Sequence, residues 1–310
     1  MKGIVIKSTG SWYIVLADNK EKIECRIKGN FRMKEIKTTN PIAVGDRVVF
    51  EKEADKDKGV ITEIEKRKNY IIRKSINLSK QTHIIAANVD QAFLMVTLAQ
   101  PKTSAGFIDR FLITAEAYGI PVIIIFNKID IYSEKEKKEL EVYKGIYEKI
   151  GYKCLSLSAI QKKEIIKLKA MMKNKINLIA GHSGVGKSTL INSLDEGLKL
   201  KIGKISQAHH KGIHTTTFAE MHELEDNIFI IDTPGVKELG LVDINKNEVS
   251  HYFHEMHAMM NQCKFNNCLH MNEPKCAIIE AVNEGRIAES RYHSYLSIMH
   301  GEELEKEYGD

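Results

Sequence analysis

Residues 181–188 read Gly181-His182-Ser183-Gly184-Val185-Gly186-Lys187-Ser188 and fit the pattern G-x-x-x-x-G-K-[ST] of a phosphate-binding P-loop. Residues 176–180 (Ile-Asn-Leu-Ile-Ala) predict a strand before this stretch, and residues 188–194 predict a helix after it, which is the setting that the pattern requires. The glycines let backbone N–H groups curl around a phosphate, and the helix N-terminus adds partial positive charge. The stretch therefore predicts an α/β domain that binds a nucleoside triphosphate.

Side chains of this loop have separate expected roles. Lys187 is expected to reach the β- and γ-phosphates of the nucleotide, and Ser188 to ligate Mg²⁺. We predict that the whole stretch and the adjacent Thr189 contact the nucleotide.

A second pattern predicts which base is bound. Asn127-Lys128-Ile129-Asp130 follows the apolar strand predicted at 121–126 and matches N-K-x-D, with which P-loop GTPases read guanine. The Asp130 carboxylate can accept hydrogen bonds from N1–H and from the exocyclic amine of guanine. Adenine offers neither donor there, so a buried Asp would stay unpaired against ATP. Ser158-Ala159, after the next predicted strand, fits the backbone contact to guanine O6 that accompanies N-K-x-D.

Two further segments are predicted to complete the phosphate and Mg²⁺ site. Asp232-Thr233-Pro234-Gly235 matches D-x-x-G and begins 45 residues after Lys187. Asp232 is expected to hold Mg²⁺ through water, and the Gly235 N–H to sense the γ-phosphate. The loop between them contains Thr215-Thr216-Thr217, and one such Thr is needed to complete the Mg²⁺ shell. For residues 232–235 the alternative is a simple Pro-Gly turn, which the preceding P-loop makes the weaker interpretation. For the Thr run the alternative is an ordinary polar loop.

The order of the motifs predicts a circular permutation. A Ras-type GTPase has P-loop, switch Thr, D-x-x-G, N-K-x-D and S-A in that order, whereas here N-K-x-D and S-A come first. Around these motifs the chain alternates between predicted strands and helices, which is typical of a mostly parallel α/β sheet. The predicted strands are 92–98, 121–126, 154–157, 176–180 and 227–231, and the predicted helices are 107–118, 133–150 (capped by Ser133), 162–172 and 188–194.

The N-terminal segment predicts a small barrel. Five β-rich stretches, 3–7, 12–17, 23–27, 47–52 and 60–64, are separated by turn signals and favour an OB-fold. Residues 1–75 carry 18 Lys/Arg against 11 Asp/Glu, whereas the rest of the chain carries 28 against 30. Such a basic barrel could bind nucleic acid, or could simply be a Lys-rich soluble domain. Trp12, Tyr13 and Phe31 could stack on bases or belong to the core.

The C-terminal part predicts helices around a metal site. Helices are expected at 248–260, 277–283 and 287–299. Between the first two lies Cys263-x4-Cys268-x-His270-x5-Cys276, whose three thiolates and one imidazole suit a closed, structural Zn²⁺ site. The alternative is a set of unrelated buried cysteines.

The residue that orients the attacking water is harder to assign. Val236 follows D-x-x-G where Ras-like enzymes have Gln, and an apolar side chain cannot orient water. His214 is the candidate because it lies beside the Thr run, with His182, His209 and His210 as competitors.

Composition limits the remaining function classes. The chain has 310 residues, 43% hydrophobic and 28% charged, and no apolar run approaches the ~20 residues of a membrane helix. Five cysteines, three of them clustered, favour a reduced cytoplasmic protein over a disulfide framework. We expect no membrane partner and a monomer.

The chain closely resembles the RsgA (YjeQ or YloQ) family of bacterial GTPases that depend on the small ribosomal subunit. The resemblance rests on segments spread over nearly the whole chain: Gly45-Asp46, Asn88-Val89-Asp90-Gln91, 127–130, 181–188, 214–217, 232–235 and 263–276. It implies an OB-fold at 1–68, a circularly permuted GTPase domain at 69–245 and a zinc-binding helical domain at 246–310. By motif position, it implies that Thr216 senses Mg²⁺ and that His214 is catalytic. Ile213 replaces the usual family Arg.

The resemblance also implies a function. It indicates GTP hydrolysis to GDP and phosphate, stimulated by the small ribosomal subunit, and rRNA binding during late maturation of that particle. The alternative is a nucleotide-gated RNA-binding module with negligible hydrolysis. GTP turnover with and without small subunits distinguishes the two.

Overall fold

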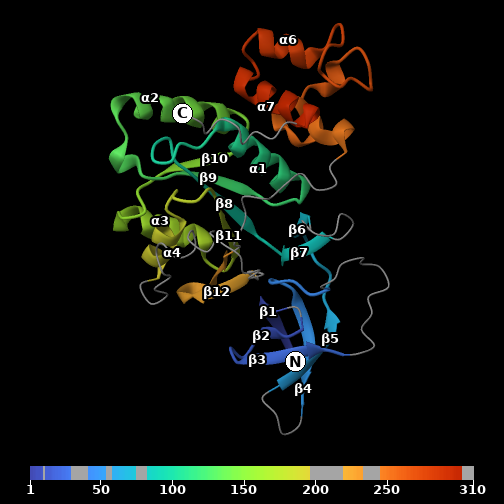
Figure 1. Ribbon diagram of the computed structural model, residues 1–310, viewed down its shortest axis with the longest axis vertical. Helices are drawn as coiled ribbons and strands as arrows, with labels where there is room; N and C mark the ends of the chain where they lie inside the picture. The colour runs from blue at the N-terminus through green and yellow to red at the C-terminus, as the bar shows by residue number, and fades with distance from the viewer. Residues whose placement is uncertain are drawn as a thin grey trace, which may run out of the picture.

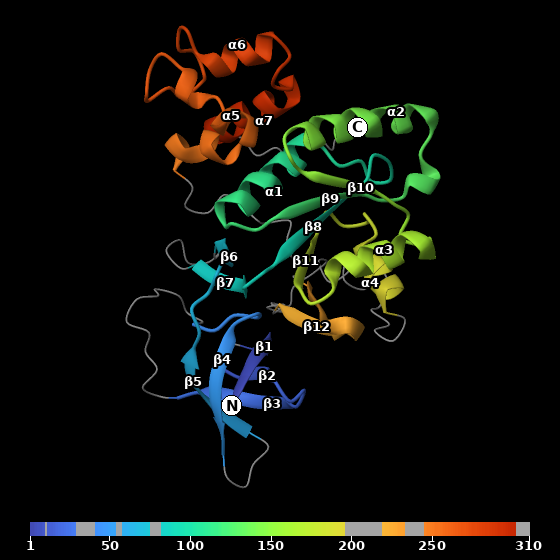
Figure 2. The ribbon, with the colours of Figure 1, turned by 180° about the vertical axis from the view of Figure 1, so that it is seen from behind.

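The structure, a computed structural model, describes residues 1–9, 11–28, 41–53, 58–74, 82–195, 219–232 and 245–301. Three parts follow one another along the long axis of the molecule (Figure 1). A small β-barrel lies at one end, an α/β sheet in the middle, and a helical part at the other end, and the reverse view shows the same arrangement (Figure 2).

The first part is a five-stranded barrel, as the strand pattern predicted. Its strands are β1 (Lys2–Ser8), β2 (Tyr13–Ala17), β3 (Lys22–Ile27), β4 (Arg47–Lys52) and β5 (Lys58–Ile64). The ring closes because β1 pairs with both β2 and β4. Alternate side chains fill its interior, and Tyr13 is one of them, so this aromatic residue belongs to the core. Trp12 is half-buried, with the Lys58 ammonium 4.5 Å from its ring centre. Phe31 lies outside the described residues.

The middle part is a six-stranded sheet in the order β10-β9-β8-β11-β13-β12. Five strands are parallel, and β12 runs antiparallel to β13. All side chains of β8 and β9 are buried, as expected for central parallel strands covered on both faces. The strands are β8 (Gln91–Val96), β9 (Val122–Phe126), β10 (Lys153–Ser156), β11 (Ile176–Ala180), β12 (Glu220–Leu224) and β13 (Ile228–Asp232).

Helices cover both faces of this sheet. The helices α1 (Ala105–Ala117) and α2 (Glu134–Lys149) pack on one face, and α3 (Lys162–Met172) and α4 (Lys187–Leu194) pack on the other. Neighbouring residues of one strand therefore enter different cores: Leu94 of β8 packs under α1, whereas Met95 packs under α4.

A hairpin that the sequence patterns do not predict joins the barrel to the sheet. It consists of β6 (Tyr70–Lys74) and β7 (Thr82–Ala87). Val44 of the barrel forms a β-bridge to Ala86, and both belong to the same hydrophobic core as strand β8. The sheet also continues directly into the barrel, since β1 pairs with β12 at Lys7 and Glu220.

Two of the segments that carry the family resemblance, Gly45-Asp46 and residues 88–91, lie at this junction. Gly45 has φ +93°, and a Cβ on it would lie 2.0 Å from the Ala87 carbonyl oxygen, so only glycine allows the approach. The Asn88 amide donates to the Gly45 carbonyl (3.0 Å). Asp46, fully buried, accepts two 2.6 Å hydrogen bonds from Arg67.

The C-terminal part consists of short helical segments around its own core. They are η4 (Lys246–Tyr252), α5 (His254–His257), η5 (Met260–Gln262), α6 (Ala277–Asn283) and α7 (Glu289–His300). The prediction of one continuous helix at 248–260 is wrong. Phe253 has an extended backbone (φ −93°, ψ 108°) and is fully buried in this core, which interrupts the helix.

Candidate functional site

The predicted P-loop connects the end of β11 to the start of α4. Its glycines adopt backbone conformations that side chains oppose, with φ +141° at Gly181 and +100° at Gly186. A Cβ on Gly181 would lie 2.3 Å from the Met95 carbonyl oxygen, and one on Gly186 would lie 2.4 Å from the Asn127 amide nitrogen. The loop therefore packs tightly against β8 and the residue that follows β9.

The ammonium group of Lys187 lies over the loop. Its Nζ donates to the carbonyl oxygens of Gly181 and His182, each at 2.6 Å. Lys187 is also the first residue of α4, so the cation and the helix N-terminus attract an anion at the same place.

Asn127 joins three loops at the carboxyl edge of the sheet. Its buried side-chain amide donates to the Val185 carbonyl oxygen (2.7 Å), and its side-chain oxygen accepts from the Ala159 N–H (2.9 Å). The structure thereby brings together the three predicted elements, N-K-x-D, S-A and the P-loop. Their place at the carboxyl ends of β9, β10 and β11 is where open α/β sheets bind ligands.

Hydrogen bonds also hold the rest of the predicted N-K-x-D loop in place. Tyr132 donates its hydroxyl to the Asn127 carbonyl oxygen (2.8 Å) and accepts from the Leu98 N–H (2.9 Å). Lys128, with φ +62°, donates to the Gln100 carbonyl oxygen (2.5 Å). Asp130 lies on the short helix η1 (Ile129–Ile131), and its side chain is exposed. The described residues leave this carboxylate accessible to water.

Contacts that the sequence patterns did not reveal support these loops. The Glu164 carboxylate in the first turn of α3 accepts from the N–H of buried Ser158 (2.8 Å). The Phe107 and His182 rings lie 3.6 Å apart between centres, which ties the P-loop to α1. Neither Phe107 nor Glu164 belongs to a motif, and in the sequence each looks like an ordinary residue of an amphipathic helix.

The predicted Cys/His set forms one cluster. The sulfur atoms of Cys263, Cys268 and Cys276 and one ring nitrogen of His270 all lie within 4.8 Å of one another, and together they could hold a metal ion. Cys263 and Cys276 have sulfurs 3.9 Å apart, and His270 Nδ1 lies 3.6 and 3.4 Å from them. Tetrahedral Zn²⁺ with ordinary bond lengths requires separations of about 3.8 Å between sulfurs and about 3.5 Å between sulfur and nitrogen. The donor set and its spacing therefore fit such an ion.

Hydrogen bonds from two tyrosine hydroxyls hold the backbone of this cluster in place. Tyr292 donates to the His270 carbonyl oxygen (2.8 Å), and Tyr295 donates to that of Leu269 (2.5 Å). Burial lowers the pKa of His270, which favours the neutral imidazole that binds a metal. Burial raises the pKa of the Cys268 thiol to about 12, so deprotonation of this ligand depends on a nearby cation.

Comparison with known proteins agrees with this geometry. Residues 64–242 match the family model of the RsgA GTPase, and residues 2–61 match that of the RsgA N-terminal domain. The chain belongs to the RsgA GTPase family. It is therefore a GTP hydrolase, and the predicted combination of OB-like barrel, permuted GTPase fold and C-terminal Cys/His cluster is confirmed.

Named relatives span the full length of the chain. The small ribosomal subunit biogenesis GTPases RsgA of Flavobacterium psychrophilum and Christiangramia forsetii are each 54% identical over 98% of this chain, covering 94% and 97% of their own lengths. Among solved structures, YjeQ from Thermotoga maritima is 35% identical with a TM-score of 0.79, and 97% of each chain is covered. YloQ, described as a circularly permuted GTPase, is 31% identical with a TM-score of 0.74, covering 97% of this chain and 94% of its own.

Part of the RsgA-type site predicted from the sequence falls beyond what the structure describes. His214, Thr216 and Gly235 lie outside the described residues, as do His209 and His210. Asp232 ends β13, next to β11 in the sheet, so its backbone lies at the same edge as the P-loop. Within the described ranges, none of the helices has the length and apolar character needed to cross a bilayer.

Proposed function

We propose that this RsgA-family GTPase hydrolyses GTP in response to the small ribosomal subunit and acts in the late assembly of that particle through rRNA binding. The observation that carries the proposal is the pair of Asn127 hydrogen bonds, which hold a guanine-reading loop against a phosphate-binding loop. Curated relatives at 54% identity are named small ribosomal subunit biogenesis GTPases, which supports the choice of particle.

The P-loop holds the triphosphate in this proposal. Backbone N–H groups of 181–189 surround the phosphates, and the Lys187 ammonium moves from the loop carbonyls to the β- and γ-phosphates. The Asp130 carboxylate accepts from N1–H and the exocyclic amine of guanine, and the Ser158-Ala159 backbone contacts O6. Lys128 and Ile129 position this carboxylate. The base then shields Asp130 from water, which makes the choice of guanine over adenine energetically strong.

The remaining groups act at the γ-phosphate. Ser188 and Thr216 ligate Mg²⁺, and Asp232 holds it through water; when bound, this ion neutralises charge on the phosphate oxygens. The Gly235 N–H contacts the γ-phosphate, and the His214 imidazole orients the attacking water. A His214→Ala variant should lose most subunit-stimulated turnover while its GTP affinity stays within about twofold, since only transition-state contacts are removed.

We further propose a cytoplasmic monomer with the barrel at 1–68, the GTPase domain at 69–245 and a zinc-binding domain at 246–310. Cys263, Cys268, His270 and Cys276 bind one Zn²⁺ whose role is structural, because four protein ligands leave no open position.

The test is GTP turnover by the full chain with and without purified small subunits. We expect slow basal hydrolysis and an acceleration of at least tenfold by the particle, as partner-supplied groups commonly provide. Tight GTP binding with no acceleration would favour the alternative, a nucleotide-gated RNA-binding module with negligible hydrolysis.

A further inference from the structure

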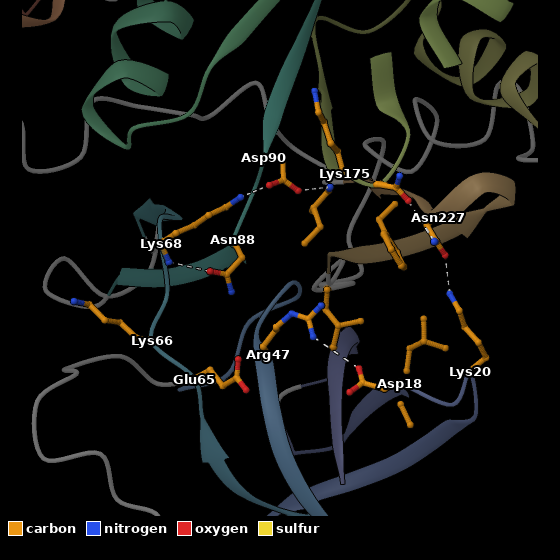
Figure 3. A pocket seen from close by; sticks show the side chains of 16 residues that line it. Asp18, Lys20, Arg47, Glu65, Lys66, Lys68, Asn88, Asp90, Lys175 and Asn227 are labelled. Atoms are coloured by element: carbon orange, nitrogen blue, oxygen red, sulfur yellow. Dashed lines mark hydrogen bonds and ion pairs between the residues drawn. The ribbon is translucent and has the colours of Figure 1, made fainter. Parts of the chain in front are cut away.

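A cleft of about 580 Å³ lies between the barrel and the sheet (Figure 3). The barrel contributes Leu16 and Arg47 among other residues, and the sheet contributes Ile176 and Phe229. The volume is within the range of small-ligand sites, which runs from about 300 to 1,000 Å³.

This cleft is separate from the GTP site. Ile176 and Phe229 lie at the beginnings of β11 and β13, whereas the P-loop follows the end of β11. The five residues of β11 place the two sites roughly 16 Å apart along the strand. Nothing in the nucleotide chemistry described above uses a residue of this cleft.

The lining combines two kinds of surface. Buried Ile4, Leu16 and Ala17 form an apolar floor beside the half-buried ring of Phe229. Charged and amide side chains surround it, among them the cations of Arg47, Lys66 and Lys68, the carboxylates of Asp18 and Asp90, and the amide of Asn227. Such a combination is typical of sites that bind one unstacked nucleotide, because the base packs on aromatic and apolar surface while amides and cations contact the base edge and the phosphate.

Two basic side chains of the cleft, Arg47 and Lys66, are accessible to a phosphate. Arg47 lies 3.8 Å from Asp18, and both side chains are more than half exposed (57% and 63%). Such a surface pair contributes little to stability, so a phosphate can replace the carboxylate at small cost. Lys66 is exposed at the rim, whereas Lys68 is already paired with Asp90.

We propose that the cleft holds one unpaired nucleotide of an RNA strand. Its base lies against Phe229 and the apolar floor, and its phosphate faces Arg47 and Lys66. An RNA strand is favoured over a free nucleotide because the +7 excess of the first 75 residues offers further phosphate contacts beyond the cleft. This inference rests on the proposed rRNA-binding function and deepens it.

The first test measures binding of a labelled 12-nucleotide single-stranded RNA of mixed sequence to the full chain loaded with a non-hydrolysable GTP analogue. Arg47→Gln should weaken binding about five- to tenfold at 0.1 M salt and lower the salt slope by about one, since one phosphate contact is lost. Asp18→Asn should tighten it. The matched control is Arg26→Gln, whose side chain is equally exposed (57%) and pairs with Glu53 elsewhere on the barrel; it should change binding by less than twofold.

The second test separates the cleft from general charge. Phe229→Leu keeps an apolar side chain but removes the ring, and RNA binding should fall at least fivefold through lost stacking. Its melting temperature and GTP affinity are recorded beside it. Cross-linking of the wild-type chain to 4-thiouridine RNA does not depend on the folding of any variant, and it should label peptides containing Phe229 or Arg47.

Several outcomes would overturn the proposal. Equal effects of Arg47→Gln and Arg26→Gln, or cross-links only elsewhere, would reject the cleft while leaving subunit-stimulated GTPase activity intact. Full displacement of the RNA by millimolar UMP or AMP would indicate a free nucleotide as the ligand instead. If the wild-type chain binds neither RNA nor small subunits, the proposed function itself fails.

Discussion

The side-chain amide of Asn127 lies 2.7 Å from the carbonyl oxygen of Val185, although 58 positions separate the two residues. This hydrogen bond connects the loop that we propose reads the base to the loop that we propose holds the phosphates. In this permuted chain the N-K-x-D loop precedes the P-loop, which is the reverse of the order in Ras-type GTPases. The two loops meet because β9 and β11 lie on either side of β8 in the sheet. The geometry of the nucleotide site therefore depends on this buried amide.

We expect Asn127→Ala to weaken GTP binding about 10- to 100-fold. Two hydrogen bonds are lost, and the buried Val185 carbonyl and Ala159 N–H are left unpaired, which costs about 1–3 kcal/mol per group. The measurement is titration with a fluorescent GTP analogue.

Asn177→Ala is the matched control for this variant. Asn177 is equally buried, and its amide donates to the Met172, Lys175 and Phe229 carbonyl oxygens, away from the three loops. It should lower stability with little change in GTP affinity. Equal losses of GTP affinity in both variants would contradict the bridging role.

Asp130→Asn should shift the base preference from guanine toward xanthine. The carboxylate accepts two hydrogen bonds from guanine in the proposed complex, and replacing one acceptor oxygen by an amide donor should weaken GTP binding by about 2–4 kcal/mol. Binding of xanthosine triphosphate should improve, because its C2 carbonyl accepts from the new amide. Asp226→Asn, an exposed Asp on another 3-10 helix, should alter neither. Unchanged selectivity in Asp130→Asn would remove this residue from base recognition.

Most of the middle sheet could be predicted from the sequence because its strands and turns are specified by residues that are adjacent in the chain. The run Val122–Phe126 is apolar at every position and rich in β-branched residues, as expected for a short strand buried on both faces. The P-loop glycines identify the turn after β11. The order of the motifs then gave the permutation.

Features that depend on tertiary contacts were not predictable in this way. The β6–β7 hairpin is too small to be stable alone and relies on its contact with Val44, although Ile71-Ile72 and Ile84-Ile85 were a weak strand signal. The break at Phe253 follows from burial against Arg291, whose guanidinium lies 4.5 Å from the ring centre. No sequence motif marks the cleft beside Phe229, because its lining residues come from segments that are distant in the sequence.

Loss of the proposed Zn²⁺ from the Cys/His cluster should destabilise the C-terminal part of the molecule. We expect about one Zn²⁺ per chain by elemental analysis, and expect Cys276→Ser to lose it and to melt at a lower temperature, because binding free energy at such a site is folding free energy. Cys154→Ser, outside the cluster, should retain the metal. A metal content well below one per chain in the wild type would reject the site.

Helix α2 offers a test that depends on pH. Ser133 caps it by accepting from the Glu136 N–H, and its own hydroxyl and N–H donate to the Glu136 carboxylate, each at 2.6 Å. These hydrogen bonds lower the pKa of Glu136 below its ordinary value of 4.5. Because the folded state favours the ionised carboxylate, its contribution is present above about pH 4.5 and is lost as the pH falls through the folded pKa.

Ser133→Ala should lower the free energy of unfolding by about 1 kcal/mol at neutral pH. Glu136→Gln should remove part of the stability loss seen between neutral and acid pH in urea unfolding. An identical pH profile in wild type and Glu136→Gln would show that this carboxylate gains nothing from folding.

A buried ionic network attaches the C-terminal part to the GTPase sheet. Arg291 of α7 donates to Asp109 of α1 (2.8 Å) and to both carboxylate oxygens of Glu255 (2.7 and 3.1 Å), and all three residues are buried. Burial alone would lower the pKa of Arg291, but Asp109 and Glu255 outweigh it and raise that pKa, so the guanidinium stays charged. Tyr147 of α2 donates to the same Asp109 oxygen (2.8 Å).

Arg291→Met should therefore lower the free energy of unfolding by about 3–5 kcal/mol, because two carboxylates remain buried without their cation. Arg286→Met is the matched control: this Arg pairs with Glu284 at 2.6 Å on the surface, and its loss should cost less than about 1 kcal/mol. Adding Asp109→Asn and Glu255→Gln to Arg291→Met should recover part of the loss, since the unpaired charges are then removed. Urea unfolding of the four proteins measures these differences, and equal values for Arg291→Met and Arg286→Met would show that the network does not hold the two parts together.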